Sequence, residues 1–391
     1  MAEHTRHARQ PLLRDRGEQS RVTNEELFFD LIYAFAVTQL SHRLLEHLTL
    51  VNAGQTLVLW FAVWLGWQYT CWVTNWFNPE HPRMRLLLFA LMLTGLALSA
   101  TIPAAFAEAG LAFALCFAAI QVIRTVVVLV SLPRDHALVP NYQRILAWVM
   151  LSATLWIAGG VAEGNTRLGF WIAGVVCEYA APMLGFAVPG LGRSATSDWT
   201  IDGGHLAERN QLFVMIALGE SVLATGASFS RAPHFDVPTV MTVITAFIGS
   251  VAMWWVYFDT GSRDGTHAIE QAADPGRIGA HFHYVHVVLI AGVIVVAVGD
   301  ELMLRRPGER MDGPATAVLI GGPLLYLAGN AAYKRIVYGG ASLSHVVGIA
   351  LMLALVPLAF VTDRLTIGGL TTLVMIGVAT IQTLHPRKVR T

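Results

Sequence analysis

The sequence predicts an all-α, polytopic integral membrane protein. Of its 391 residues, 55% are hydrophobic and only 13% are charged, and the mean hydropathy is +0.55. A soluble domain carries roughly 25% charged residues, so this composition excludes a soluble globular protein. The apolar residues also occur in long runs, and a run of roughly 20 apolar residues is long enough to cross a bilayer as a helix.

Twelve such runs are separated by Gly, Pro, Asn or charged residues. They cover residues 27–47, 56–77, 86–107, 111–131, 145–162, 168–188, 207–226, 240–259, 284–303, 316–334, 343–362 and 367–384. The fourth run is the least regular because Gln121 and Arg124 lie inside it. The prediction is about twelve transmembrane helices, and ten or eleven also fit.

The positions of the basic residues predict the orientation. With the N-terminus in the cytoplasm, 19 of the 26 Lys and Arg residues lie on the cytoplasmic side, as the positive-inside rule requires. The exception is the loop with Arg305, Arg306 and Arg310, which would face outward. We expect a multi-pass protein of the cytoplasmic membrane, with both termini in the cytoplasm and no cleaved signal peptide.

The chain divides into five segments. These are an Arg-rich cytoplasmic segment (1–24), a six-helix half (25–188), a cytoplasmic linker rich in Gly, Ser and Thr (189–204), a second six-helix half (205–385) and a basic tail (386–391). A shift of 185 residues places Leu27-Phe28 on Leu212-Phe213, which suggests a duplication. Because each half has an even number of spans, the halves would form a parallel tandem 6+6 repeat.

Two acids begin the first helix. Thr23 or Asn24 can cap it, and Glu26 precedes Asp30 by four residues, so both carboxylates lie on one face. A carboxylate inside a membrane helix costs roughly 2.5 kcal/mol or more and normally faces protein or water, where it marks an ion or proton path. The structural alternative is an acid favoured by the helix dipole, which explains Asp30 less well than Glu26.

The seventh run contains a second group of charges. Glu208 and Arg209 precede Glu220, and eleven residues separate Arg209 from Glu220. They therefore share a face but stand roughly 16 Å apart along the axis, so each needs a partner from another helix. A buried structural ion pair or hydrogen bond explains these residues as well as a functional site does.

The ninth run begins with three histidines. His281 and His283 do not share a helix face, so a three-histidine metal site in this segment has poor geometry, and interfacial histidines are the favoured interpretation. His286 is the deepest and remains a candidate proton acceptor. In the second run, Trp60, Trp64, Trp67, Trp72 and Trp76 form an aromatic stripe that is typical of packing.

No other motif indicates chemistry. Cys71, Cys116 and Cys177 form no cluster, and the sequence has no phosphate-binding loop, nucleophile elbow, zinc motif or dinucleotide fingerprint. We therefore expect no cofactor and no metal. Zero net charge argues against nucleic acid as a partner. The expected partners are the lipid bilayer and an unidentified small ion or molecule, and the sequence leaves homo-oligomers open.

Four motifs in order resemble the bacterial low-temperature-requirement protein A family. They are Glu26-Leu-Phe-Phe-Asp30-Leu, His205-Leu-Ala-Glu-Arg209 with Leu-Gly-Glu220-Ser, Trp254-Trp-Val-Tyr-Phe258 and Tyr284-Val-His286. The resemblance covers nearly the whole chain and implies a multi-pass bacterial membrane protein. It implies no particular substrate, because the family is named for a growth phenotype.

A fainter resemblance is to the potassium and proton channels of lysosomes and bacteria that are built from six-helix repeats. Those channels carry Phe-Ser-Asp in the first helix after an Arg. Here the segment is Phe28-Phe29-Asp30, Arg21 lies further upstream, and Met215 occupies the matching position of the second half. This resemblance therefore implies shared ancestry rather than channel activity.

The leading functional prediction is an ion- or proton-linked transporter or channel. Its polar path would be lined or gated by Glu26, Asp30, Glu208, Arg209, Glu220 and His286. On this prediction the protein is not an enzyme. One alternative is a membrane-embedded metal-dependent enzyme with ligands from the first, seventh and ninth helices. The other is a structural or stress-related membrane scaffold whose buried polar groups only fix helix register.

Overall fold

The computed structural model describes residues 11–14, 21–195, 201–232, 234–259, 264–265, 268–269, 272 and 274–385. In these residues the secondary structure is helical, apart from isolated β-bridges. The first half contains α1 (Asn24–Glu46), α2 (Leu50–Trp76), α3 (Pro82–Thr101), α4 (Gly110–Ser131), α5 (Val139–Val161) and α6 (Gly164–Met183). The second contains α7 (Gly203–Ser230), α8 (Val237–Phe258), α10 (Pro275–Arg305), α11 (Gly313–Leu319), α12 (Gly321–Tyr338), α13 (Leu343–Ala359) and α14 (Arg364–Leu384).

The predicted fold class, a polytopic helical membrane bundle, is confirmed. Each of the twelve predicted runs falls mostly on helix, with the tenth divided between α11 and α12. The fourth is the continuous helix α4 despite its polar residues. Within the described residues, nine helical segments are long and apolar enough to cross a membrane. The helices α1 and α6 are not among them, and the apolar α13 has only 17 residues. The exact number of twelve spans therefore stays a prediction.

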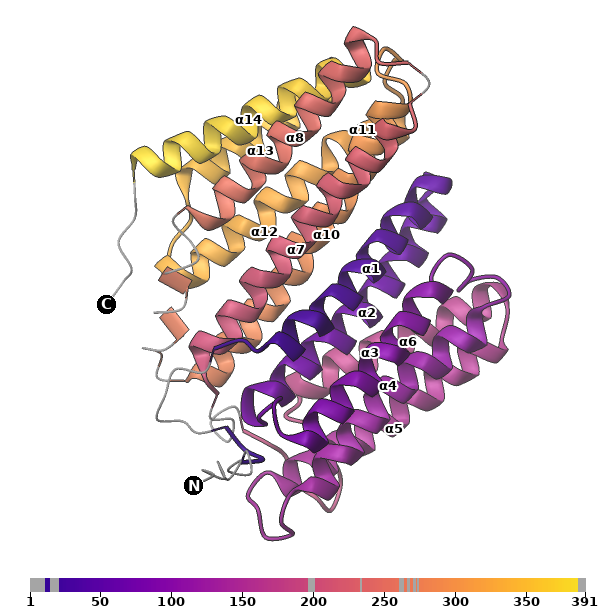
Figure 1. Cartoon of the computed structure of the whole chain (residues 1–391), viewed down its shortest axis with the longest axis vertical. Coiled ribbons are helices and arrows are strands. Elements are labelled where there is room, and N and C mark those ends of the chain that lie inside the picture. Colours follow the sequence, from indigo (N-terminus) through magenta and orange to yellow (C-terminus); the bar gives the residue numbers. More distant parts are fainter. Residues whose placement is uncertain are drawn as a thin grey trace, which may run out of the picture.

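The two halves repeat one order of helix contacts (Figure 1). In the first half α3 packs against α1 and α4, and α5 packs against α4 and α6. In the second half α10 packs against α7 and α12, and α13 packs against α12 and α14. A tandem duplication would produce this correspondence, although the repeat itself stays a prediction.

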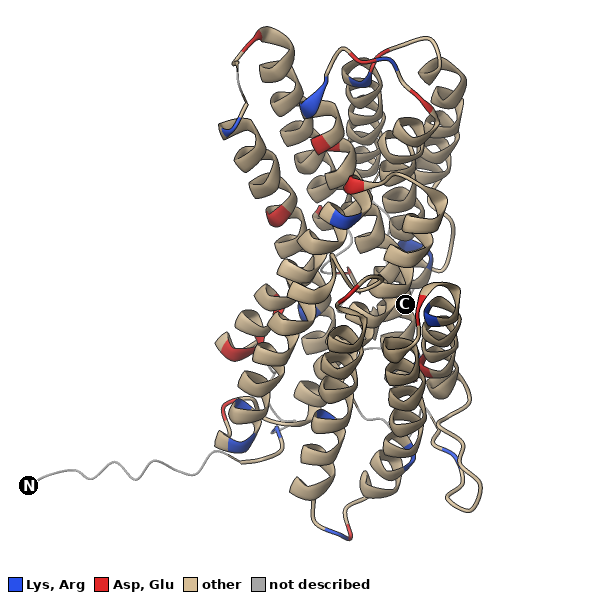
Figure 2. Cartoon of the chain, turned by 90° about the vertical axis from the view of Figure 1, so that its right-hand side faces the viewer, with Lys and Arg blue, Asp and Glu red and all other residues tan. Residues whose placement is uncertain are grey.

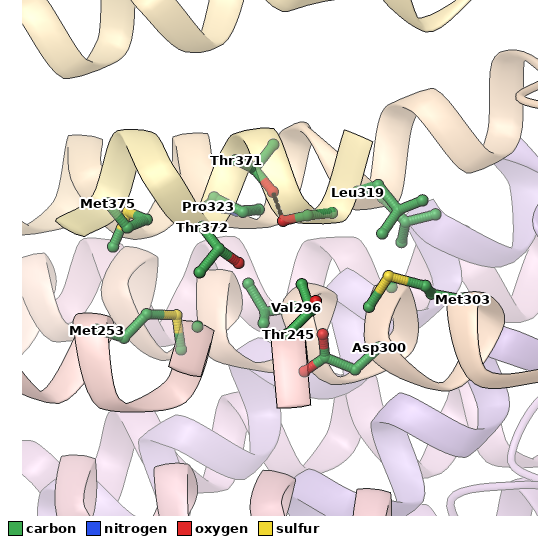
Figure 3. A pocket seen from close by; sticks show the side chains of 14 residues that line it. Thr245, Met253, Val296, Asp300, Met303, Leu319, Pro323, Thr371, Thr372 and Met375 are labelled. Carbon is green, nitrogen blue, oxygen red and sulfur yellow. Dashed lines mark hydrogen bonds between the residues drawn. The ribbon is translucent and has the colours of Figure 1, made fainter. Parts of the chain in front are cut away.

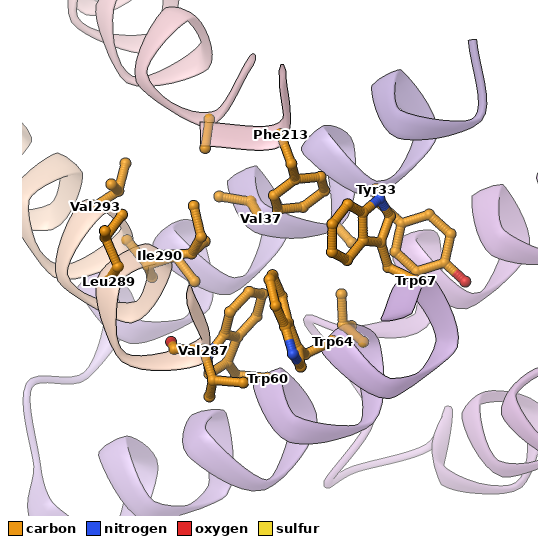
Figure 4. Packing of buried hydrophobic residues seen from close by; sticks show 14 of the residues in the cluster. Tyr33, Val37, Trp60, Trp64, Trp67, Phe213, Val287, Leu289, Ile290 and Val293 are labelled. Atoms are coloured by element: carbon orange, nitrogen blue, oxygen red, sulfur yellow. The ribbon is translucent and has the colours of Figure 1, made fainter. Parts of the chain in front are cut away.

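The halves meet where α1 and α2 pack against α7 and α10. The tryptophan stripe of α2 lies in this interface, with Trp60, Trp64 and Trp67 packed against Phe213 and the apolar face of α10 (Figure 4). The indole of Trp60 also donates a 3.1 Å hydrogen bond to the carbonyl of Val287. These tryptophans are therefore packing residues between the halves.

Within the second half, glycines let α10 and α12 approach closely. A Cβ atom on Gly292 would lie 2.5 Å from the backbone nitrogen of Tyr326, and one on Gly329 would lie 2.8 Å from that of Leu289. No side chain fits at such a distance, so the two backbones touch as in other membrane helix pairs with small residues at the contact.

We call the end of the bundle at which α1 and α7 begin the proximal end, and the opposite end the distal end. Charged residues occupy short stretches of the ribbon, and most of the helix length carries none (Figure 2). The loop after α10 lies at the distal end, where Arg305 pairs with Glu301 at 3.0 Å and Arg306 with Glu309 at 3.4 Å. These ion pairs offset the positive charge of the loop that departs from the positive-inside rule.

Candidate functional site

A buried cluster of charges joins α1 to α7 near the proximal end. The guanidinium of Arg209 donates to both carboxylate oxygens of Asp30, with Nη2 2.5 Å from Oδ1 and Nε 3.2 Å from Oδ2. Its Nη1 donates to Oε1 of Glu26 at 2.9 Å. All three side chains are fully buried. The sequence predicts a partner for Arg209 on another helix, and the structure provides two, the carboxylates of Glu26 and Asp30 on α1.

The local sequence of α1 places Glu26 in this cluster. Thr23 is the N-cap, and its hydroxyl accepts from the backbone N–H of Glu26. Oε2 of Glu26 in turn accepts from the backbone N–H of Thr23 at 2.9 Å, which completes a capping box. Asp30 follows one helical turn later on the same face, so both acids point toward α7.

Three further residues complete the cluster. Arg14 donates to Oε2 of Glu26 at 2.8 Å. The amide of Asn75 lies 3.2 Å from Nδ1 of His205, while Nε2 of His205 lies 2.9 Å from Oε1 of Glu26. The same Nε2 also lies 3.1 Å from Nη2 of Arg14, so His205 contacts both members of the Arg14–Glu26 ion pair.

The helix α2 closes the cluster from the side. The indole of Trp67 donates to Oδ1 of Asp30 at 2.6 Å, and Thr74 accepts from Arg209 at 3.1 Å. Two carboxylates are thus matched by the guanidinium groups of Arg209 and Arg14, so the buried site is close to neutral when the histidine is uncharged. A closed and fully paired arrangement of this kind holds helices in register, and it opens only if the ion pairs separate.

A cavity of about 530 Å³ lies between α1, α7 and α10 on the distal side of this cluster. Glu220 lines it, half-buried, and its Oε1 accepts a 2.6 Å hydrogen bond from Thr38 of α1. Further polar and charged lining residues are Ser41, His42, Glu46, Ser221, Ser228, Arg231, Glu301 and Arg305. The predicted partner of Glu220 on another helix is therefore Thr38. The carboxylate of Glu220 also faces a space large enough for a small molecule.

Apolar packing separates the cavity from the buried cluster. Val37, Ala217 and Val293 line the cavity and also belong to the core that contains Phe213 and Trp67. Figure 4 shows Val37 and Val293 in the packing that leads to the tryptophans of α2. On the other side of this packing, Trp67 contacts Asp30. The aromatic and aliphatic side chains therefore separate the polar groups of the cavity from those of the buried cluster.

The structure brings some of the predicted site residues together and leaves others apart. Glu26, Asp30 and Arg209 form the buried cluster, and Glu208 lies beside it, where its carboxylate accepts from the backbone N–H of Val22 at 3.3 Å. Glu220 lies in the cavity instead. Five of the six predicted residues are thus divided between two places along the interface of the halves.

His286 lies in neither place. It is buried among α8, α10 and α12, with Nε2 2.7 Å from the hydroxyl of Tyr257 and Nδ1 2.6 Å from the carbonyl of Phe282. His283 lies beside the tryptophans of α2, with Nδ1 3.0 Å from the carbonyl of Gly279. In the part of the chain that the structure describes, no group of three or more His, Cys, Asp and Glu residues is arranged to hold a metal ion.

The first half contains a second buried polar cluster, and none of its residues belongs to the predicted site. In the first half, Glu178 of α6 accepts from Gln121 of α4 and from Ser152 of α5, each at 2.5 Å. Arg124 donates to Gln121 and lies 3.4 Å from the hydroxyl of Thr70. The sequence held a signal for this cluster, because Glu178 is a lone carboxylate inside the sixth apolar run.

Comparison with known proteins agrees with the motifs. Residues 21–380 match the family described as bacterial low temperature requirement A protein. A protein of Rhizobium meliloti (strain 1021), described as uncharacterized, is 36% identical over 371 residues, which cover 94% of this chain and 90% of that protein. No solved structure matches the chain. With the match extending over both halves and both parts of the site, the chain belongs to the bacterial low temperature requirement A protein family.

Proposed function

We propose that this membrane protein is an ion- or proton-linked transporter for a small polar or charged solute. The observation that carries the proposal is the cavity of about 530 Å³ around Glu220. Ligand sites in proteins have volumes of roughly 300–1,000 Å³. A carboxylate that faces such a space at membrane depth is typical of an ion or proton path. On this proposal the chain is a transport protein rather than an enzyme.

The charges around the cavity favour a polar solute. Glu46 and Glu301 bring negative charge, and Arg231 and Arg305 bring positive charge. Although Arg305 and Glu301 pair with each other, a cavity lined by both signs suits a solute that carries a charge or separated charges better than it suits a lipid tail, which offers these groups no hydrogen bonds.

The closed cluster favours a transporter over an open channel. Glu26, Asp30 and Arg209 lie at the proximal end of the same interface, with an aromatic layer between them and the cavity. Because α1 and α7 come from different halves, separation of these ion pairs would open the proximal side, and re-pairing would close it. Such alternating access is expected when two bundles move around a site at their interface.

The scaffold alternative also rests on an observation. The cluster of Arg209 is fully paired, and paired buried charges fix helix register without any transport. The cavity separates the two candidates, since a scaffold has no need of a half-buried carboxylate in an open space.

Flux through purified protein in liposomes tests the proposal. A pH-sensitive dye inside the liposomes would report proton movement under an imposed pH or ion gradient. We expect flux with the native protein and none above protein-free liposomes with Glu220→Gln. Glu163→Gln, which changes an exposed carboxylate outside the cavity, is the matched control and should retain the flux. Native protein that behaves like protein-free liposomes under every gradient would refute the proposal.

Cysteine labelling tests the cavity directly. Ala224 lines the cavity, whereas Ala36 is buried in the packed interface. A membrane-impermeant thiosulfonate should therefore modify Ala224→Cys from the distal side and leave Ala36→Cys unmodified, in a background without native cysteines. Equal labelling of both positions would mean that the interface is not packed as described.

A further inference from the structure

Asp300 of α10 is a buried carboxylate outside the site described above. Asp300 is only 8% exposed, and the Oδ2 atom of its carboxylate has no hydrogen-bond partner among the described residues. A buried carboxylate oxygen without a partner is costly, and in native proteins such groups usually find a partner, a water or an ion. The open oxygen therefore makes Asp300 a candidate ligand for a bound water or ion.

Asp300 lines a small cavity of about 30 Å³. Its walls come from α8, α10, α11, α12 and α14, and Figure 3 shows Thr245 and Thr372 around the same space as Asp300. A cavity needs roughly 10–15 Å³ to hold one water molecule. The space therefore admits a single water or one small ion, and it is too small for an organic solute.

The helical span beside the cavity has a one-residue interruption at Ile320, across which the bonds from Ile320 to Thr316 and from Leu324 to Ile320 are kept. The span from Gly313 to Tyr338 is interrupted, since α11 ends at Leu319 and α12 begins at Gly321. Leu319 and Pro323 both line the cavity. Proline has no N–H to donate to the carbonyl four residues earlier, so the carbonyl of Leu319 lacks its usual helical donor. Interrupted helices at membrane depth are tolerated where they line a cavity, and their free carbonyls are ligands for cations.

We propose that this cavity binds one dehydrated sodium ion. The carboxylate of Asp300, the hydroxyls of Thr245 and Thr372 and the carbonyl of Leu319 supply hard oxygen ligands from four helices. A monovalent cation balances the single negative charge of the site, whereas a divalent cation would leave an uncompensated positive charge at membrane depth.

The proposal does not depend on the transport function. Asp300 lines the small cavity, while its neighbour Glu301 lines the large one around Glu220. The two cavities therefore lie on different faces of α10. A binding measurement on purified protein tests the sodium site without any flux, so its failure would be distinct from a failure of the transport assay.

Thermal unfolding of the purified protein in detergent tests the site. A ligand that binds only the folded state raises its stability in a saturable way. We expect NaCl to raise the melting temperature relative to choline chloride at equal ionic strength. Direct binding of radioactive sodium should give about one ion per chain. Asp300→Asn should lose this binding, and Thr372→Val should weaken it by about tenfold, the effect of one lost polar contact.

Glu163→Gln is the matched control, because it removes an exposed carboxylate far along the chain from the cavity; it should bind sodium as the native protein does. Thr372→Val keeps the test informative if Asp300→Asn does not fold. The proposal would be overturned by equal stabilisation in choline chloride, or by unchanged sodium binding in either cavity variant. Preferential binding of silver ions would also overturn it, since that would identify the thioethers of Met253, Met303 and Met375, which line the same cavity, as the ligands.

Discussion

Replacement of Asp30 by Asn tests the buried cluster. The change keeps the shape of the side chain but removes the charge that accepts two hydrogen bonds from Arg209, at 2.5 and 3.2 Å. Removal of one partner of a buried ion pair costs about 3–5 kcal/mol, because the other charge stays buried without compensation. Arg209 keeps its 2.9 Å contact with Glu26, so we expect the lower end of this range, about 3 kcal/mol.

The matched comparison is Glu220→Gln. Glu220 is half-buried at the cavity, and in the part of the chain that the structure describes its carboxylate accepts one hydrogen bond, from Thr38. The amide oxygen of Gln can accept the same bond, so the loss should be about 1 kcal/mol or less. Equilibrium unfolding in mixed micelles, followed by tryptophan fluorescence, measures both free energies under the same conditions.

A double-mutant cycle assigns the loss to the ion pair. Asp30→Leu and Arg209→Met should each destabilise the protein strongly, and the double variant should be more stable than the sum of the two losses predicts, because no unpaired charge then remains at this position. If Asp30→Asn costs no more than Glu220→Gln, or if the two single losses simply add, the account of this cluster as a buried interhelical ion pair is wrong.

Three further predictions concern packing, topology and metal content. Gly292→Ala should lower the melting temperature strongly, because its Cβ would lie 2.5 Å from the backbone of α12, whereas Gly377→Ala, which has nothing within 4 Å, should be neutral or slightly stabilising. Reporters fused after Arg21 and within the linker 189–204 should both indicate the cytoplasm, and a periplasmic linker would rule out six spans in the first half. Elemental analysis of purified protein should find no stoichiometric zinc or iron, and about one such ion per chain would instead favour the enzyme alternative.

Much of the architecture could be predicted from local features of the chain. The twelve apolar runs fall on helix because hydropathy and chain length determine what can cross a bilayer, and both are properties of a short segment. Glu26 and Asp30 could be identified as candidate site residues from the sequence alone, because a carboxylate in a membrane helix is costly whichever helix packs against it. The family could be recognised because its motifs are likewise contiguous stretches of sequence.

The partners of these residues could not be predicted. Arg209 pairs with Asp30 across 179 residues of sequence, and Glu220 contacts Thr38 across 182. The sequence predicts one polar path for the site residues. The packed halves instead divide them between a closed cluster and an open cavity, and His286 lies apart, next to Tyr257. Apolar helix faces are chemically alike, so hydropathy does not distinguish one neighbour from another. The partners depend on which small residues let two backbones approach and on which buried charges find each other once the helices are packed.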